Sequence, residues 1–417
     1  MTKQEFTNTL YTNDNLFILN GLNSNLVDLI YLDPPFNSKR MYSAPVGSKA
    51  AGTSFKDMWT WADVNEAYLE ALAEKYPVLK QLIEVAGTIH SKAMAAYLTY
   101  MAQRIIEMYR VLKDTGSLYL HCDPTASHYL KALLDEIFGK HNFRNEIVWH
   151  YTGNSVPKYN FPRKHDTLFW YSKSPELCFN PNSVLLPYSE LTDKRYNHTD
   201  KQGRRYKISA LRDGKQEIVY KKEGKYPDDV WEIPIIRSNE RVGYPTQKPL
   251  ALLQRIIKAS SNEGDIVMDP FCGCATTCVA AQQLGRKWIG IDIEKQAVSI
   301  LTERLSDDAG MFKDFINTTK VPQRTDITIE EPSQSVKERL YKKQEGKCNG
   351  CGNEYLMKDM EIDHIIPKAK GGGDYYENYQ LLCGSCNRIK GDRPMEYLRL
   401  KIKTREETMK NKIIFGE

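Results

Sequence analysis

Residues 28–38 read DLIYLDPPFNS, so an acid, two prolines and an aromatic ring directly follow a stretch that suits a buried strand. The strand ends at Asp33, whose carboxylate can accept hydrogen bonds. Pro34 and Pro35 restrict the backbone that follows, and Phe36 offers a ring face. Taken alone, an acid before two prolines is more often a capped turn than a catalytic group. Other motifs in the chain are needed to distinguish a capped turn from a catalytic group.

A second acid ends a second predicted strand in GDIVMDPFCGCATTCVAAQQLG, residues 264–285. After Asp269 comes a turn of small residues around Gly273, where a ligand can approach the backbone, and then a helix start with free N–H groups. Asp292 ends the next strand, 23 residues after Asp269, which is typical of an acid that binds ribose hydroxyls. No GxGxxG motif or phosphate-gripping lysine is present, which favours an adenosine ligand without phosphates. A plain strand-to-helix turn is the alternative.

Cysteines occur in two settings. Cys272, Cys274 and Cys278 stand in the turn just described, where packing of small residues is a better explanation than a metal. Two CxxC pairs, Cys348/Cys351 and Cys383/Cys386, enclose 31 residues near the C-terminus. Four thiolates suit a tetrahedral structural zinc ion, which would stabilise a module too short to bury a sufficient core. We therefore predict zinc at these four cysteines.

Composition limits the class of protein. The 417 residues are 41% apolar, no apolar run approaches the length of a membrane span, and the first residues do not resemble a signal peptide, so we expect a cytoplasmic protein without a membrane partner. The net charge is +5, but residues 194–225 hold eleven Lys or Arg against four acids, with tyrosines interleaved. Such a stretch can bind phosphates and stack on bases, although a solvated surface would look the same.

The elements that must position these residues alternate between apolar strands and helices. Residues 91–112 repeat apolar side chains every three or four positions, which predicts an amphipathic helix. Strands are expected in DTGSLYLHCDP, EIVWHY and DTLFWY. This alternation predicts an α/β fold with a mostly parallel, Rossmann-like sheet and helices on both faces. The pattern breaks over residues 172–240, and residues 319–335 read as a linker.

Together these motifs resemble the β group of the S-adenosylmethionine-dependent DNA amino-methyltransferases, over residues 1–318. The family combines DPPY or a close variant with a DPFxGxGT-like loop, and YPTQKP at residues 244–249 also matches. The order of motifs places target recognition at residues 172–240. One departure is Ala275, where the family usually has glycine. A negative φ there would make the methyl group nearly harmless, and we expect weakened or unchanged cofactor binding.

The resemblance assigns roles to individual residues. Asp33 and the carbonyl of Pro34 accept the N–H groups of a base amine, Pro35 helps to fix them, and Phe36 stacks on a base flipped out of the duplex. Asp14 contacts the cofactor adenine, and Thr246 and Lys248 line its methionine side. The cofactor loop contributes Asp269, Phe271, Gly273 and Thr276, and the next strand contributes Asp292. His121 is expected to be structural. Asp33, where serine would suggest cytosine, favours adenine N6, and N4-cytosine methylation is the alternative.

Residues 336–395 resemble the HNH nucleases with their ββα-metal motif, and the module is assigned to residues 336–400, before a tail at 401–417. The resemblance makes His364 the general base for water and makes Asn378 the residue that steadies its loop. Asp363 and Asn387 hold a divalent ion, Mg²⁺ or Mn²⁺. Many members have histidine at the position of Asn387, but the amide keeps an oxygen ligand. A zinc knuckle that only binds DNA is the alternative.

The predicted protein is therefore a DNA adenine methyltransferase fused to an HNH endonuclease, as in restriction-modification, acting on double-stranded DNA. An orphan methyltransferase with a DNA-clamping HNH module is a different class that the sequence leaves open. A homodimer is expected from the family alone.

Overall fold

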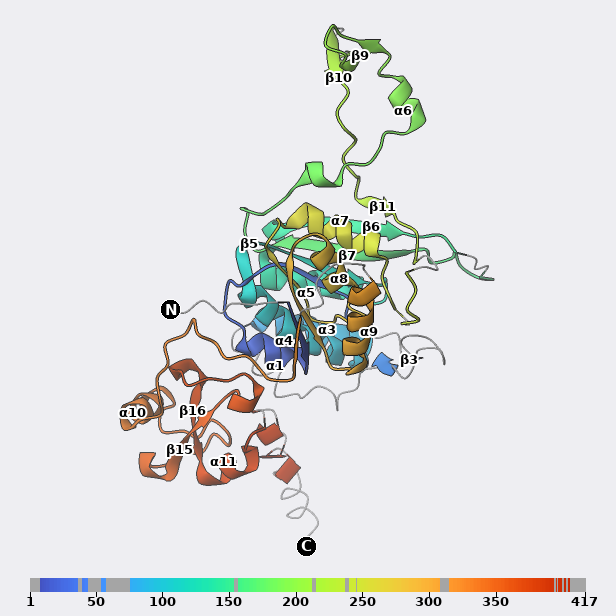
Figure 1. Cartoon of the computed structure of the whole chain (residues 1–417). Coiled ribbons are helices and arrows are strands. Elements are labelled where there is room, and N and C mark those ends of the chain that lie inside the picture. The colour runs from blue at the N-terminus through green and yellow to red at the C-terminus, as the bar shows by residue number, and fades with distance from the viewer. Residues whose placement is uncertain are drawn as a thin grey trace.

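The computed structural model describes residues 8–36, 40–43, 54–57, 76–153, 157–211, 215–236, 240–244, 246–307, 315–393, 395, 397–399, 401–402 and 404–405 (Figure 1). Residues 406–417 of the predicted tail and residues 212–214 of the basic stretch lie outside this part of the chain.

A nine-stranded sheet forms the centre of the larger body, in the order β11-β6-β7-β5-β2-β12-β13-β1-β14. The bounds are β1 Thr9–Thr12, β2 Val27–Leu32, β5 Leu112–Cys122, β6 Phe143–His150, β7 His165–Ser172, β11 Val230–Glu232, β12 Ile266–Asp269, β13 Lys287–Asp292 and β14 Ile316–Thr318. Neighbours run parallel except at β7, which is antiparallel to β5 and β6. The predicted mostly parallel sheet is confirmed.

The central strands are buried on both faces, which explains why apolar residues dominate them. Strand β2 reads VDLIYL and β12 reads IVMD, without the alternation of a half-exposed strand. A separate hairpin pairs β3, Arg40–Ser43, with β4, Ser54–Asp57.

Helices cover both faces of the sheet (Figure 1). One face carries α1 Asn15–Gly21, α3 Pro77–Ile89, α4 Lys92–Val111 and α5 Ser127–Leu134, which continues as a π-helical turn, Asp135–Gly139. The other carries α7 Leu250–Ser260, α8 Thr276–Gln283 and α9 Gln296–Asp307. Helix α4 is the helix predicted over 91–112, and it begins there because the side chain of Ser91 accepts a hydrogen bond from the N–H of Met94.

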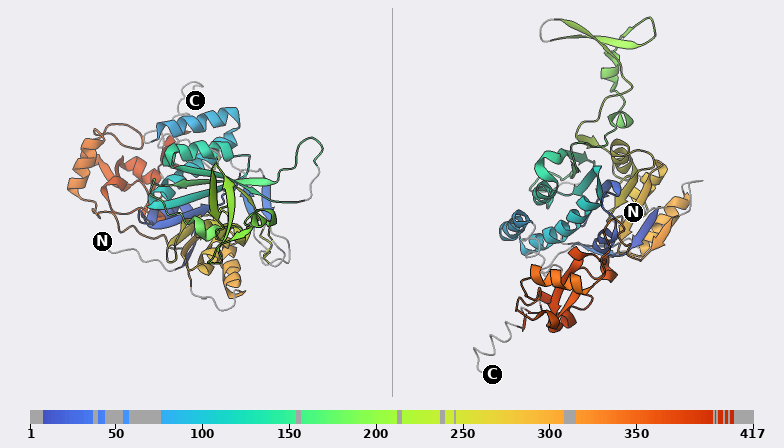
Figure 2. Two further views of the ribbon diagram at one scale, coloured as in Figure 1. Left: turned by 90° about the horizontal axis from the view of Figure 1, so that it is seen from above. Right: turned by 90° about the vertical axis from the view of Figure 1, so that its left-hand side faces the viewer.

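The predicted recognition region contains a projecting arm, residues 186–225. The arm is closed at its base by pairing of Leu186 with Lys225. It carries α6 Glu190–Lys194 and a three-stranded antiparallel sheet of β8 His198–Thr199, β9 Arg205–Ala210 and β10 Gln216–Tyr220. Figures 1 and 2 show it extending from the body. After the arm, β11 returns to the edge of the main sheet beside β6.

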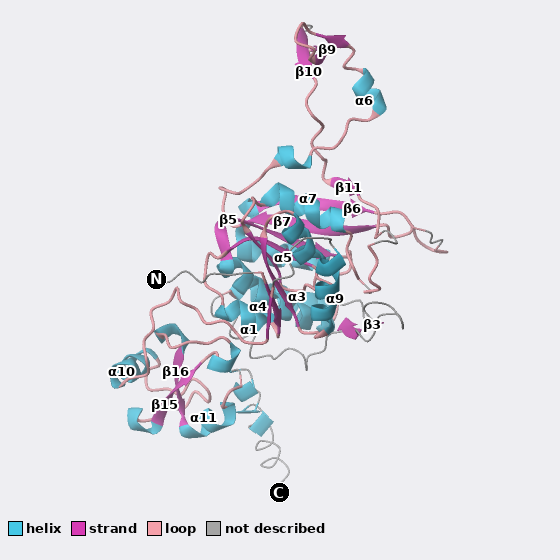
Figure 3. Ribbon diagram, in the orientation of Figure 1, coloured by secondary structure: helices cyan, strands magenta, loops and turns pink. Residues whose placement is uncertain are grey.

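The C-terminal module is a small domain in which helices surround a pair of strands (Figure 3). Helix α10, Gln334–Lys343, precedes the antiparallel pair β15 Met360–His364 and β16 Tyr379–Cys383, and α11, Gly384–Lys390, follows. This is the predicted ββα order. Its own core joins Val336 and Leu340 of α10 to Leu381, Leu382 and the cysteines.

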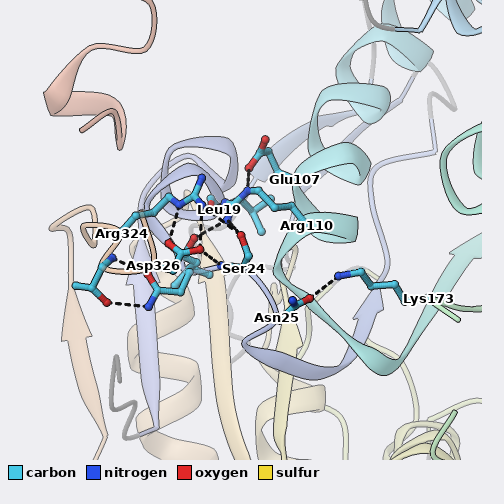
Figure 4. A network of polar contacts seen from close by, with 11 residues as sticks. Leu19, Ser24, Asn25, Glu107, Arg110, Lys173, Arg324 and Asp326 are labelled. Carbon is cyan, nitrogen blue, oxygen red and sulfur yellow. Dashed lines mark hydrogen bonds and ion pairs between the residues drawn. The ribbon is translucent and has the colours of Figure 1, made fainter. Parts of the chain in front are cut away.

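Residues 319–332, which we call the strap, join the two parts and lie against α1. Asn23 and Thr325 exchange two hydrogen bonds of 2.8 Å each, and the N–H of Ser24 donates to Asp326 at 2.9 Å. Arg324 binds both Asp326 and the hydroxyl of Ser24 (Figure 4). Part of the predicted linker is therefore bonded to the larger body.

Among the described residues, no helix is long and apolar enough to cross a membrane.

Candidate functional site

The carboxyl ends of β1, β2, β12 and β13 meet at one edge of the sheet and surround a pocket of about 430 Å³. Parallel sheets bind ligands at this edge because their loops converge there. All twelve residues predicted for the methylase part line this pocket: Asp14, Asp33, Pro34, Pro35, Phe36, Thr246, Lys248, Asp269, Phe271, Gly273, Thr276 and Asp292. Residues near the start and near the end of the methylase sequence thus line one cavity.

Asp269 is buried and Asp292 is half-buried, and both accept hydrogen bonds from the backbone around them. Asp269 accepts bonds from the Thr277 hydroxyl at 2.5 Å and the Phe271 N–H at 3.0 Å, and Asp292 accepts from the N–H groups of Gly273 at 2.7 Å and Glu294 at 2.8 Å. Burial raises the pKa of Asp269 to about 7 and that of Asp292 to about 6, although these bonds favour the charged forms. Both carboxyl groups hold the loop in shape as well as facing the pocket.

Ala275 corrects one expectation. Its φ is +58°, in the left-handed region, so the premise of a negative φ is wrong. The residue precedes α8, where its carbonyl accepts from Val279 and its own N–H donates to Cys272 at 2.6 Å. The methyl group is buried, and the left-handed backbone costs roughly 1–3 kcal/mol for a residue other than glycine. Packing around the loop must offset that cost.

The three loop cysteines, Cys272, Cys274 and Cys278, are buried. They form no group of metal ligands with other described residues. Their burial agrees with a packing role.

Asp14 caps α1, and its carboxylate is shared. It accepts from the N–H of Leu16 at 2.8 Å and pairs with Arg104 at 3.0 Å. Arg104 is nearly buried in α4 and also donates to Asn15, which in turn donates to the carbonyl of Pro270 in the cofactor loop. Arg104 was not among the predicted site residues, and the one signal for it in the sequence is a charge on the apolar side of a helix.

Asp33 is paired with Lys248 rather than standing alone. The Lys248 Nζ lies 2.7 Å from Oδ2 of Asp33, while Oδ1 is buried without a hydrogen-bond partner among the described residues. Lys248 was predicted on the methionine side of the cofactor, and its contact with the acid was not foreseen.

His121 lies behind the DPPF segment and is fully buried, as expected of a structural residue. Its Nδ1 lies 2.9 Å from the Tyr31 hydroxyl and its Nε2 lies 3.1 Å from Asp166. Burial alone would raise the pKa of Asp166, but His121, Lys248 and Tyr151 together outweigh it and the pKa is lowered. The imidazole stacks on Phe36 with centroids 6.0 Å apart and so supports the ring from behind.

The four cysteines of the C-terminal module converge as predicted. Their sulfur atoms lie within 4.8 Å of one another, the spread expected of a tetrahedral zinc site. Backbone N–H groups of Cys383 and Gly350 donate to the sulfur of Cys348 at 3.2 and 3.4 Å, bonds that stabilise a metal-bound thiolate. Cys348, Cys351, Cys383 and Cys386 therefore fit a zinc ion.

His364 is held by an acid that the sequence analysis did not name. Its Nε2 lies 2.9 Å from Oδ1 of Asp374, which also accepts from Lys368 and Tyr379. Burial alone would raise the pKa of Asp374, but these three donors lower it to about 2. Asn378 bonds the backbone of Ile366 in both directions and so fixes the turn after His364.

Asp363 and Asn387 have other partners. Asp363 pairs with the buried Lys390 at 2.9 Å and accepts from Gln380 at 2.8 Å. The amide of Asn387 donates to Glu361. A divalent ion could bind Asp363 only by competing with the Lys390 ammonium, so the fit of the predicted ion is incomplete in this arrangement.

Comparison with known proteins agrees with this arrangement of two sites. Residues 27–303 match the family model described as DNA methylase, and the chain belongs to that family. Residues 348–393 match the model of the HNH endonucleases, so the chain carries an HNH domain after its methylase domain. Both predicted families are confirmed.

Individual relatives are methyltransferases by name. The type II methyltransferase M.EcaI of Enterobacter cloacae is 28% identical over 365 residues, which cover 75% of this chain and 72% of that protein. The DNA adenine methyltransferase YhdJ of Escherichia coli is 27% identical over 312 residues, covering 71% of this chain and 82% of that protein. Among solved structures, a DNA modification methylase of Thermus thermophilus with S-adenosylmethionine matches 75% of this chain and 99% of its own, with a TM-score of 0.41 and 16% identity.

Proposed function

We propose that the methylase domain transfers a methyl group from S-adenosylmethionine to the N6 amine of adenine in duplex DNA. The observation that carries this proposal is Oδ1 of Asp33, a buried acceptor that has no hydrogen-bond partner among the residues that the structure describes and lies on the wall of the pocket that the cofactor loop also lines. A buried acceptor of this kind is costly unless a ligand supplies the missing hydrogen bond.

The residues of the chain supply orientation and charge. S-adenosylmethionine, when bound, brings an already activated methyl group. Asp33 and the carbonyl of Pro34 accept the two N–H groups of the base amine and turn its lone pair toward the methyl carbon. The two prolines hold these acceptors before substrate arrives, and Phe36, backed by His121, stacks on the flipped base. Asp292 binds the ribose hydroxyls, and Asp14 contacts the adenine of the cofactor.

Adenine is favoured over cytosine because DPPF carries an acid, and because YhdJ, a relative, is named an adenine methyltransferase. N4-cytosine methylation is the second candidate. The test is nucleoside analysis of DNA from cells that express the chain. We expect N6-methyladenine, and 4-methylcytosine would refute the adenine assignment. Asp33→Ala should abolish the product while S-adenosylmethionine still binds, since Asp33 faces the base rather than the cofactor.

The HNH domain is proposed to cut duplex DNA, with His364 as general base and Asp374 holding its Nε2. The zinc ion would hold the fold, and Asp363 and Asn387 would hold Mg²⁺ or Mn²⁺ once the ion displaces Lys390 from Asp363. The second candidate is a DNA clamp without catalysis, which the crowded surroundings of Asp363 favour. Unmethylated DNA incubated with zinc-loaded protein and either ion should be nicked, and His364→Ala should not nick it. If the parent protein does not nick this DNA, the nuclease proposal fails and the non-catalytic DNA clamp takes its place.

Two further expectations accompany this function. We propose that the chain acts in the cytoplasm, where DNA and cofactor are both available, and that it forms a homodimer, which light scattering would test.

A further inference from the structure

Lys248 joins two parts of the site that are 215 residues apart in sequence. Its Nζ lies 2.7 Å from Oδ2 of Asp33, and its side chain is only 10% exposed. The same Nζ lies 5.2 Å from the centre of the Phe36 ring. A single ammonium group therefore contacts both the acid and the aromatic ring of the DPPF segment.

The backbone that carries Lys248 is fixed on both sides. The side chain of Gln247 is buried, accepts from the N–H of Val242 at 3.0 Å and donates to the carbonyl of Glu240 at 2.7 Å. On the other side, Pro249 caps α7, whose Leu252 and Leu253 are fully buried. The ammonium is thus presented by anchored backbone, as a positioning group must be.

The two oxygens of Asp33 consequently differ. Oδ2 is occupied by Lys248, whereas Oδ1 is buried and has no partner in the described part of the chain. A carboxylate can rotate about its last bond, so two equivalent oxygens would offer no defined direction to a substrate. A charge-assisted bond to one oxygen fixes the plane of the group and leaves the other in a known place.

We infer that Lys248 is a positioning residue for methyl transfer, which holds Oδ2 of Asp33 so that Oδ1 faces the amine of the target base. This inference rests on the proposed methylase function. It differs from the role on the methionine side of the cofactor that the resemblance implies for Lys248. It also gives the ammonium a second effect, because a cation over the Phe36 ring fixes the ring that stacks on the base.

The test measures methylation kinetics of the full chain with Lys248→Met, which keeps most of the apolar stem and removes the charge. At saturating cofactor and DNA we expect kcat to fall about 10- to 100-fold, because small displacements of a positioning acceptor are costly. The KM for S-adenosylmethionine and the affinity for DNA should change by less than about twofold. Lys248→Arg should recover part of kcat, since guanidinium also bonds a carboxylate.

A double variant separates positioning from general damage to the fold. In an Asp33→Asn background, Lys248→Met should cause little further loss, because the two residues act as one unit. Lys287→Met is the matched control, since Lys287 is exposed at the amino end of β13, away from the site. It should leave kcat unchanged, and thermal unfolding should be similar for all variants.

Three outcomes would overturn the inference. If Lys248→Met raises the KM for S-adenosylmethionine and spares kcat, the lysine belongs to the methionine side of the cofactor. If it tightens DNA binding and spares kcat, the ammonium merely fills an empty base pocket. If it changes nothing, the ion pair has no role. A parent chain that methylates no DNA would instead refute the proposed function, and the inference would fall with it.

Discussion

The protonation of Asp292 should make the affinity for S-adenosylmethionine depend on pH. Burial raises its pKa to about 6, whereas an ionised carboxylate is the better acceptor for ribose hydroxyls. Cofactor binding should favour the deprotonated form, so affinity for S-adenosylmethionine should be full above about pH 7 and weaken as the pH falls through 6, by at most about tenfold per pH unit for one proton. Calorimetric titration between pH 5 and 8 measures this dependence.

The variant Asp292→Asn is the control for that prediction. It cannot titrate, so its weaker affinity should lose the step near pH 6, while Asp269, with a pKa of about 7, still titrates. An unchanged pH profile in Asp292→Asn would assign the step to another group.

At the scale of elements, the arm can be tested for DNA contact. The turn between β8 and β9 carries exposed basic side chains, among them Lys201 and Arg204, and Arg204 lies 4.5 Å from the centre of the Tyr220 ring. If Lys201 contacts a phosphate, Lys201→Ala should lower the slope of log affinity against log salt by about one. Glu217→Ala, on the exposed face of β10, should leave the slope as it is or raise affinity.

Exchanging residues 186–225 for those of a relative should change the methylated sequence, and an unchanged sequence would refute recognition by the arm.

The two zinc knuckles form the other element that can be tested separately. Cys383→Ser removes one of four converging thiolates and leaves the backbone N–H that donates to the sulfur of Cys348 in place. Because metal binding and folding are coupled in so small a core, the module should lose zinc and unfold. Methylation should persist. His364→Ala should keep its zinc, and metal analysis with circular dichroism distinguishes the two variants.

At the scale of the whole molecule, the arm and the HNH domain lie at opposite ends of the body (Figures 1 and 2). The strap docks the HNH domain near α1, where Lys370 lies 5.4 Å from the Phe17 ring and the N–H of Glu330 donates to the carbonyl of Asp374. The loop that carries the partner of His364 is thus in contact with the strap. The two domains should unfold with partial coupling rather than independently.

Gly21→Ala tests this docking. A Cβ there would lie 1.9 Å from the carbonyl oxygen of Pro322, so the strap would have to move. Asp326→Ala is an independent route, because it removes the bonds to Ser24 and Arg324. Both variants should speed proteolysis within the strap and lower the nicking rate, whereas Glu331→Ala, an exposed site, should not. Equal proteolysis in all three would show that the docking is not stabilising.

The sequence by itself determined the fold class, the two families and the residues that gather at the pocket. Mainly apolar strands such as β2 and β12, which lack strict alternation, favour a parallel sheet, and a parallel sheet brings the carboxyl ends of its strands together. The convergence of the four C-terminal cysteines was likewise predictable, since the spacing of the CxxC pairs limits their geometry. Local patterns of this kind need no knowledge of distant neighbours.

Tertiary structure alone decided which groups pair across long sequence separations. Three ion pairs are examples: Lys248 with Asp33, Arg104 with Asp14, and Lys390 with Asp363. None of these pairs produces a periodic pattern in the sequence. The left-handed φ of Ala275 and the docking of the strap on α1 were also hidden, because both depend on packing around them. Charged residues far apart in sequence pair only when the folded chain brings them together, so the ion pairs of both sites could be identified only in the tertiary structure.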